Sequence, residues 1–484
     1  MNKLIRITVL PQKQNIEAAP GDNLLAILRS AGLAPEAPCG GGGRCGKCRV
    51  LIDGAEALAC QTVIDRDIIV TLPGAGTERI LSEGLTPEMK SDRGGYLLAF
   101  DIGTTTVVGY LLEGKTGREL ASHSLRNPQS AFGADVISRI QHALKGHQEA
   151  LTNAIRQCTT EITLSLCDQA GISPSEITTV SLVGNPAMQQ LFLGLSPENL
   201  ARLPFAPVLT RAQTVSAKAY IPLWENGELL IVPDIAGFVG ADTVACVLAT
   251  ELDQQEEITL LVDIGTNGEM VLGNSRRMVA CSTAAGPALE GANIQFGMRG
   301  QTGAIDHVWL ENSKFAYRVI GGGEAEGICG SGLIDAVAAA LDAGLLNARG
   351  RIQNEDRIIP LTEQIHLTQE DIRQVQLAKG AIAAGIEQLA AHLGITLEDI
   401  DRVYLAGAFG TFMDPQSACR IGLLPPALAG KIEPVGNAAG SGAKLLALDS
   451  RALEKTQELV SRIEVLELAA VPEFQRRFAR NMRF

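Results

Sequence analysis

The sequence is poor in aromatic residues and positive charge, and it has no long apolar run. Aromatic residues make up 4% of the 484 residues, and the formal net charge is −13. A nucleic-acid partner would favour a basic face, so the charge argues against one. No stretch approaches the roughly 18 apolar residues of a membrane span, and the first residues contain no apolar signal region. We therefore expect a cytoplasmic protein without membrane contact.

Two common kinds of site are also missing. Residues 436–444 look like a Walker A loop but lack its Gly-Lys-Ser/Thr ending. The six histidines lie singly along the chain, and none has the spacing of a metal-ligand pair. A nucleotide site must therefore be of another kind, and a metal site must use other ligands.

Four of the ten cysteines form one dense pattern in a glycine-rich loop. They follow a C-x5-C-x2-C-x11-C spacing and are Cys39, Cys45, Cys48 and Cys60. Plant-type [2Fe-2S] ferredoxins use a related spacing, and glycines let backbone N–H groups approach cluster sulfurs. Zinc is the alternative, although zinc sites usually come as two short Cys pairs. The pattern predicts a [2Fe-2S] cluster, and we expect the other six cysteines to be inert buried thiols.

The segment around these cysteines has a β-grasp pattern. We expect a helix that begins at Asp22 and ends near Ser30, and strands over 4–10, 14–18, 48–52 and 68–72. This pattern predicts an α+β ferredoxin domain over residues 1–73. Residues 74–95 are rich in chain breakers and read as a linker. About 20 extended residues would reach roughly 60–70 Å, which would let the domain move between donor and acceptor.

An apolar strand beginning at Tyr96 runs into an Asp-x-Gly-Thr-Thr-Thr turn and a second apolar strand. The turn contains Asp101, Gly103, Thr104, Thr105 and Thr106. Glycine allows a tight hairpin whose N–H groups and hydroxyls face a phosphate, and the aspartate can hold Mg²⁺ through water.

A near-copy of this hairpin follows about 160 residues later. It contains Asp263, Gly265, Thr266, Asn267, Gly268 and Glu269. A third element, in which a strand ends in a small-residue turn, contains Gly407, Ala408 and Gly410. The repetition indicates an internal duplication and resembles the two-lobed α/β ATPases of the sugar kinase/Hsp70/actin (ribonuclease H-like) superfamily. We expect lobe I over 96–255 and lobe II over 256–484, with the C-terminal helix as a candidate to return to lobe I.

Further glycine-rich segments stand at apparent strand-to-helix junctions. Such junctions can bind anions at a helix N-terminus, or they can simply allow close packing. They cover residues 183–186, 237–242, 284–291 and 327–332.

Taken together, these motifs resemble the reductive activators of corrinoid proteins, in which a ferredoxin domain precedes an Hsp70/actin-type ATPase. The resemblance covers nearly the whole chain and also includes Asn127-Pro-Gln, 132–140 and 405–410. It implies that ATP drives one electron from the cluster onto a Co(II) corrinoid protein, giving Co(I) for methyl transfer. Better-known members carry an extra domain between ferredoxin and ATPase, where this chain has only residues 74–95.

The resemblance also implies roles for residues in the three ATP elements. Asp101 and Asp263 would place Mg²⁺ and the attacking water, and the hairpin threonines with Asn267 would hold phosphate oxygens. Glu269 is a candidate base, or else only pairs with a neighbour. The third element would flank the nucleoside. The partners implied are a corrinoid protein and a low-potential electron donor, for a monomer or a homodimer.

Three other functions stay open at this stage. The first is ATP-driven electron donation to another low-potential enzyme, such as a radical dehydratase. The second is a small-molecule kinase with a redox-sensing domain. The third is a non-catalytic module that senses ATP and redox state and binds a partner.

Overall fold

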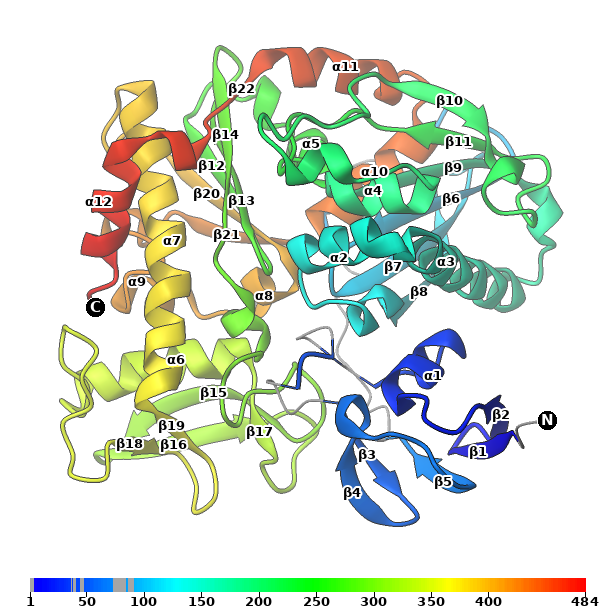
Figure 1. Cartoon of the computed structure of the whole chain (residues 1–484). Coiled ribbons are helices and arrows are strands. Elements are labelled where there is room, and N and C mark those ends of the chain that lie inside the picture. The colour runs from blue at the N-terminus through cyan, green and yellow to red at the C-terminus, as the bar shows by residue number, and fades with distance from the viewer. Residues whose placement is uncertain (1–3, 36, 38–40, 44–47, 73–83, 86–90) are drawn as a thin grey trace.

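The computed structural model describes residues 4–35, 37, 41–43, 48–72, 84–85 and 91–484. A small N-terminal domain lies beside two larger lobes, each built around its own six-stranded sheet (Figure 1). No helix in the described ranges has the length and apolar character needed to cross a bilayer.

The N-terminal domain is a five-stranded sheet with one helix packed on it. The strand order is β2-β1-β5-β3-β4, and the buried stripe of the helix, which includes Leu24 and Leu28, fills the core. The elements are β1 Ile5–Leu10, β2 Gln14–Ala18, α1 Leu24–Ser30, β3 Arg49–Ile52, β4 Ala55–Leu58 and β5 Ile68–Thr71.

The first turn of α1 differs from the expectation at Asp22. Asn23 is the N-cap, and its side chain accepts the N–H of Ala26. Asp22 instead accepts the N–H of Ala19 in the preceding turn. Both residue types cap helices well, and the bridge between Asn23 and Val63 places Asn23 at the cap position.

Lobe I contains a sheet of order β10-β11-β9-β6-β7-β8. Strands β6, β7 and β8 form an antiparallel meander, and β9 and β11 extend it in parallel from β6. The strands are β6 Tyr96–Ile102, β7 Thr106–Glu113, β8 Glu119–Arg126, β9 Ile177–Gly184, β10 Gln213–Ser216 and β11 Glu228–Ile231.

Lobe II repeats five strands of this topology in a sheet of order β21-β20-β12-β13-β14-β22, and the sixth strand lies at the opposite edge. Its meander is β12-β13-β14, and β20 and β21 again continue in parallel. The strands are β12 Thr259–Ile264, β13 Gly268–Gly273, β14 Met278–Thr283, β20 Arg402–Ala406, β21 Ile432–Gly436 and β22 Ile463–Val465. The shared topology agrees with the duplication that the two hairpin motifs predict.

Helices pack between and outside the two sheets. One buried cluster joins α5 and α10 to both sheets, a second lies under α3 and α4 in lobe I, and a third lies under α7 in lobe II. The helices are α2 Val136–His142, α3 Gln148–Ala170, α4 Pro186–Leu193, α5 Ala241–Thr250, α7 Gln369–Leu393, α8 Gly407–Phe412, α10 Ala438–Leu448, α11 Ala452–Arg462 and α12 Pro472–Asn481.

The segment that returns to lobe I is not the terminal helix. Helix α10 packs on α5, β6 and β9 of lobe I, and α11 also contacts α5. Helix α12 lies on α7 of lobe II, where Arg480 pairs with Glu387.

Lobe II also carries a smaller α+β subdomain at the end nearer the ferredoxin domain (Figure 1). Its elements are β15 Ala304–Glu311, β16 Lys314–Val319, β17 Gly327–Ile328, α6 Gly330–Asp342, β18 Ile358–Pro360, β19 His366–Thr368 and α9 Pro415–Arg420.

Most described residues between the ferredoxin domain and lobe I are attached to α10 and its flanks. Gly84 forms a bridge with Gly436, Leu85 accepts the hydroxyl of Ser441, and Asp92 accepts the hydroxyl of Ser450. The reach expected of a free linker over 74–95 is therefore too large. The chain between Leu72 and Gly84 spans at most about 40 Å when extended.

Candidate functional site

The third and fourth motif cysteines meet at the base of the β3–β4 hairpin. Cys48 immediately precedes β3, and its carbonyl accepts the N–H of Ala59 at 2.8 Å, next to Cys60. The cap residue Asn23 also donates to the Cys60 carbonyl at 3.0 Å. Cys48 is buried and Cys60 is half-buried. Cys39 and Cys45 lie outside the described residues.

The two hairpins and the third motif line one cavity of about 280 Å³ between the lobes. Most of the predicted residues contribute to its wall, namely Asp101, Gly103, Thr104, Thr105, Thr106, Asp263, Gly265, Thr266, Asn267, Glu269 and Gly407. Two predicted glycines do not: Gly268 packs against Thr283, and Gly410 packs against Leu405. Ala408 belongs to α8, and its side chain is outside the described set.

Five carboxyl groups line this cavity, and besides Glu290, described below, four of them have raised pKa values. These four belong to Asp101, Asp242, Asp263 and Glu269. Burial, reinforced by repulsion from Asp242, raises the pKa of Asp101 and of Asp263 to about 7. Burial raises the pKa of Asp242 to about 6 and that of Glu269 well above its usual range. These carboxyl groups therefore cannot all be ionised together without a compensating positive charge.

Gly407 brings the third motif against the second hairpin. Its φ is +82°, and a Cβ there would lie 2.6 Å from Asp263 Oδ1. Only glycine combines this backbone conformation with so close an approach. The glycine therefore fixes where the start of α8 meets the acidic cluster.

Each of the glycine-rich junctions supplies residues to the cavity. Asn185 caps α4 and donates to Thr104 Oγ1 at 3.1 Å. The other junctions contribute Asp242, Leu289, Glu290, Cys329, Gly330 and Ser331. The glycines signalled these positions in the sequence, although packing and ligand binding were equally compatible with them.

Several polar residues of the cavity lie outside the predicted set of site residues, and two of them bond directly to predicted ones. Asn437 donates to Asp101 Oδ2 at 2.9 Å. Glu290 accepts hydrogen bonds from both hairpins, from Thr105 Oγ1 at 2.8 Å and from Thr266 Oγ1 at 3.1 Å. Both residues stand in segments that the sequence marked only by their glycines. Glu269, the candidate base, accepts a hydrogen bond from the hydroxyl of Ser282 at 3.2 Å.

A second cavity of about 170 Å³ lies behind Glu290. It shares Thr104, Thr105, Glu290, Met298 and Arg299 with the first cavity. Its wall also includes Ala37 of the ferredoxin domain, two positions before Cys39 in the sequence, and the guanidinium-bearing residues Arg126 and Arg139.

The ferredoxin domain also contacts lobe I through α1. The guanidinium of Arg29 lies over the ring of Phe132, 5.7 Å from its centre. The cysteine-bearing domain therefore stands beside the wall that holds the first hairpin.

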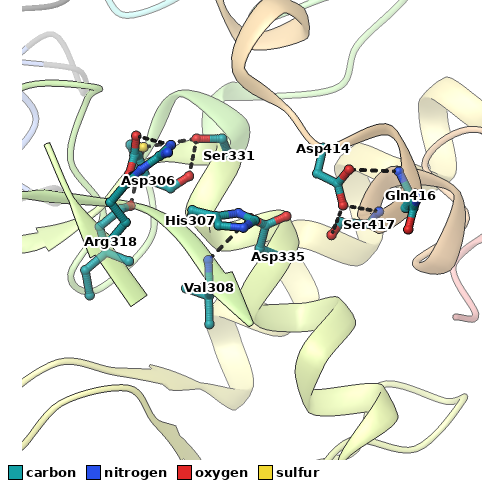
Figure 2. Close-up of polar contacts among 11 residues, drawn as sticks. Asp306, His307, Val308, Arg318, Ser331, Asp335, Asp414, Gln416 and Ser417 are labelled. Carbon is teal, nitrogen blue, oxygen red and sulfur yellow. Dashed lines mark hydrogen bonds and ion pairs between the residues drawn. The ribbon is translucent and has the colours of Figure 1, made fainter. Parts of the chain in front are cut away.

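Another polar cluster supports the subdomain of lobe II rather than the cavity floor. Figure 2 shows Asp335 of α6 facing His307 and the backbone of Val308, and Arg318 paired with Asp306. Burial raises the pKa of Asp335, and hydrogen bonds from Ser417 and His307 oppose that shift.

Comparison with known families assigns nearly the whole chain. Residues 7–65 match the 2Fe-2S iron–sulfur cluster binding domain. Residues 96–255 match the family described as the RACo middle region, and residues 257–484 match the C-terminal domain of RACo, the ASKHA domain.

Three relatives show how far the similarity extends. Corrinoid activation enzyme RamQ of Eubacterium limosum is 37% identical over 429 residues, 82% of this chain and 72% of that protein. The [Co(II) methylated amine-specific corrinoid protein] reductase of Methanosarcina barkeri is 28% identical over 403 residues, 76% and 73% of the two chains. A solved reductive activator for corrinoid, iron–sulfur protein superposes with a TM-score of 0.73 at 29% identity, covering 99% of this chain and 98% of that one.

These matches also bear on the division of the chain into domains. The family's middle region corresponds to lobe I itself, at residues 96–255. The solved relative is covered almost completely, whereas the two curated relatives are longer than this chain.

Proposed function

This chain belongs to the family of reductive activators of corrinoid proteins, and we propose that it uses ATP to drive one electron from its ferredoxin domain onto a Co(II) corrinoid protein. The product is the Co(I) form, which is competent for methyl transfer. One observation carries the proposal most directly: Ala37 of the ferredoxin domain lines a cavity that shares Thr104, Thr105 and Glu290 with the nucleotide cleft. The cluster and the nucleotide would thereby be close to each other.

The described cysteines fit the expected cluster. The β3–β4 hairpin holds Cys48 next to Cys60, and Asn23 fixes the Cys60 backbone. With Cys39 and Cys45 they would form a four-thiolate set, and the bound cluster would supply the single electron. The domain boundaries 1–73, 74–95, 96–255 and 256–484 belong to the same proposal.

The carboxyl groups of the cleft fit Mg²⁺, whose bound charge would neutralise phosphate oxygens. Asp101 of lobe I and Asp263 of lobe II would hold the ion and the attacking water. The hydroxyls of Thr104, Thr105 and Thr266 and the amide of Asn267 would bind phosphate oxygens. Glu269 is the candidate to accept a proton from the attacking water, since burial keeps its pKa high.

The nucleoside would lie against the start of α8. Gly407, Ala408 and Gly410 make that turn small, and Phe409 and Phe412 line the cavity nearby. In this arrangement both lobes contact one nucleotide, so ATP binding would favour a closed form.

Closure of the two lobes would supply the free energy that uphill electron transfer requires. Plant-type [2Fe-2S] centres lie near −400 mV, and Co(I) formation needs a lower potential. A gap of about 100–200 mV for one electron costs roughly 2–5 kcal/mol. Differential binding of the corrinoid partner to the closed form can supply that amount, and hydrolysis then releases the partner. A low-potential donor would re-reduce the cluster.

The decisive assay follows the visible spectrum of a Co(II) corrinoid protein. It contains the purified activator, a low-potential reductant and ATP, and the expected result is the Co(I) spectrum only when all are present. Asp263→Asn should abolish the ATP-dependent step, and Asp356→Asn, the same change at an exposed site of lobe II, should not. Equal reduction without ATP would contradict the proposal.

Phosphorylation of a small hydroxyl compound by the same protein would instead favour a kinase. Tight ATP binding with negligible turnover would favour a sensing module. Electron transfer to a radical dehydratase would favour the remaining alternative.

A further inference from the structure

The Glu290 carboxylate accepts hydrogen bonds from one threonine hydroxyl of each phosphate hairpin. One carboxylate oxygen accepts Thr105 Oγ1 of lobe I, and the other accepts Thr266 Oγ1 of lobe II. The two threonines occupy corresponding turns of the duplicated lobes. A single side chain thus spans both halves of the proposed phosphate site.

This arrangement is incompatible with a γ-phosphate bound by the same two hydroxyls. Each threonine hydroxyl has one proton to donate, so a phosphate oxygen and Glu290 compete for it. The carboxylate and the phosphate are both negative, and their close approach is unfavourable. ADP has no γ-phosphate and therefore does not compete with Glu290 for these two hydroxyls.

The second cavity offers space that the side chain of Glu290 could enter by rotation. Glu290 lies in the wall between the two cavities, and the far cavity is lined by Arg126, Arg139 and Arg299. The charge of Glu290 already acts on the buried guanidinium of Arg139, opposing the fall in its pKa that burial causes. Arg139 in turn donates to the carbonyl of Thr104 in the first hairpin.

The backbone around Glu290 confines the movement to a short segment. Leu289 is 2% exposed and anchored in the core of lobe II, so the segment cannot shift as a whole without disturbing that core. Gly286 and Gly291 flank residues 287–290 with φ values of +78° and +79°. Rotation of the Glu290 side chain between the two cavities therefore needs the least rearrangement.

We propose that Glu290 distinguishes ATP from ADP: the γ-phosphate takes the hydroxyls of Thr105 and Thr266 and displaces the Glu290 carboxylate into the arginine-lined cavity beside the ferredoxin domain. This inference rests on the proposed ATP site and adds a specificity-determining residue to it. Ala37 of the cysteine-bearing domain forms part of the same cavity wall. The displaced carboxylate would therefore contact a cavity that this domain shares, which couples the domain to γ-phosphate binding.

Titration calorimetry with ADP and with a non-hydrolysable ATP analogue tests the proposal. Glu290→Gln keeps the shape of the side chain but removes its charge. We expect the variant to bind the analogue about tenfold more tightly than the wild type, with ADP affinity unchanged, because hydrogen bonds to a charged acceptor no longer compete. Glu290→Ala should act in the same direction. Glu324→Gln, an exposed site in the same lobe, should change neither affinity.

Hydrogen exchange of residues 286–301 supplies an independent readout. In the wild type, the analogue but not ADP should alter exchange there, and in Glu290→Gln this difference between nucleotides should disappear. Equal changes for both nucleotides, or none for either, would overturn the proposal. So would a lower ATPase rate with unchanged affinities, which would make Glu290 a hydrolytic residue.

The two proposals fail in different ways. If wild-type protein binds neither nucleotide, the proposed function and the role of Glu290 fall together. If nucleotides bind but the Glu290 variants show no selective gain, only the role of Glu290 is lost. Neither readout requires a corrinoid protein, so the electron acceptor does not affect the result.

Discussion

The side-chain amide of Asn437 donates a 2.9 Å hydrogen bond to Asp101 Oδ2, which joins α10 to the first hairpin. The same amide accepts the N–H of Gly440 at 2.7 Å through its oxygen and thereby caps α10. A residue that directly follows β21 of lobe II therefore orients a carboxylate of lobe I.

Replacing Asn437 by serine or alanine separates these two contacts. Serine can still cap α10 but is too short to reach Asp101, so stability should stay near that of the wild type while ATPase activity falls. Alanine should also lose about 1 kcal/mol of unfolding free energy with the cap. Urea unfolding and steady-state ATPase rates check both expectations. Full activity in Asn437→Ser would show that Asp101 is oriented without this bond.

Gly407→Ala should lower nucleotide affinity and ATPase activity because its Cβ would lie 2.6 Å from Asp263 Oδ1. Gly344→Ala is the matched control, since its φ is also positive at +69° but no atom lies within 4 Å of the added Cβ. Both variants should lose about 1 kcal/mol of stability from backbone strain. Only Gly407→Ala should lose activity, and equal activities in the two variants would contradict the assigned close approach.

Cys48→Ser should remove most of the visible absorbance of the cluster and abolish electron transfer. Nucleotide affinity should be retained, because the cleft residues lie in the two lobes. Cys158→Ala provides the comparison: it lies in the core of lobe I, where burial raises the pKa of its thiol to about 12. That variant should keep the absorbance. Loss of nucleotide binding in Cys48→Ser would mean that the domains depend on one another to fold.

Magnesium should stabilise the protein more at high pH than at low pH. The pKa of Asp101 and Asp263 is about 7 in the folded chain, against an ordinary value of 3.8. Between these values the folded state binds more protons, so without a cation stability falls as pH rises through this window. Mg²⁺ binds the ionised carboxylates and offsets that loss.

Thermal unfolding with and without Mg²⁺ measures this effect. The rise in Tm caused by Mg²⁺ should be large near about pH 8 and small near about pH 5, where the carboxyls hold their protons. Asp263→Asn should reduce the rise at the higher pH. An equal rise at both pH values would separate Mg²⁺ binding from these carboxyl groups.

The sequence predicted the parts of the site that are local in the chain. Asp101 and Asp263 each lie near the end of an apolar strand and precede a glycine turn, so the strand, the turn and a polar side chain facing the cavity could be inferred from a few consecutive residues. Repetition of the motif then indicated two similar lobes. The observed sheets have that matching topology.

The contacts made between distant segments could not be predicted in the same way. Glu290 meets Thr105 across 185 residues, and Asn437 meets Asp101 across 336. No local pattern distinguishes a bridging glutamate from a surface one, because the partner appears only when the lobes come together. The cap of α1 is a similar case, because Asn23 and not Asp22 forms a bridge with the distant Val63.

The attachment of Gly84, Leu85 and Asp92 to α10 and its flanks has a consequence for electron delivery. A tethered domain acts at an effective concentration fixed by its tether, and a shorter tether raises that concentration near the attachment point. With at most about 40 Å of chain before Gly84, the cluster meets partners only within a small volume around the nucleotide lobes. An acceptor must enter that volume to be reduced, so we expect it to approach the ATPase lobes before it receives the electron.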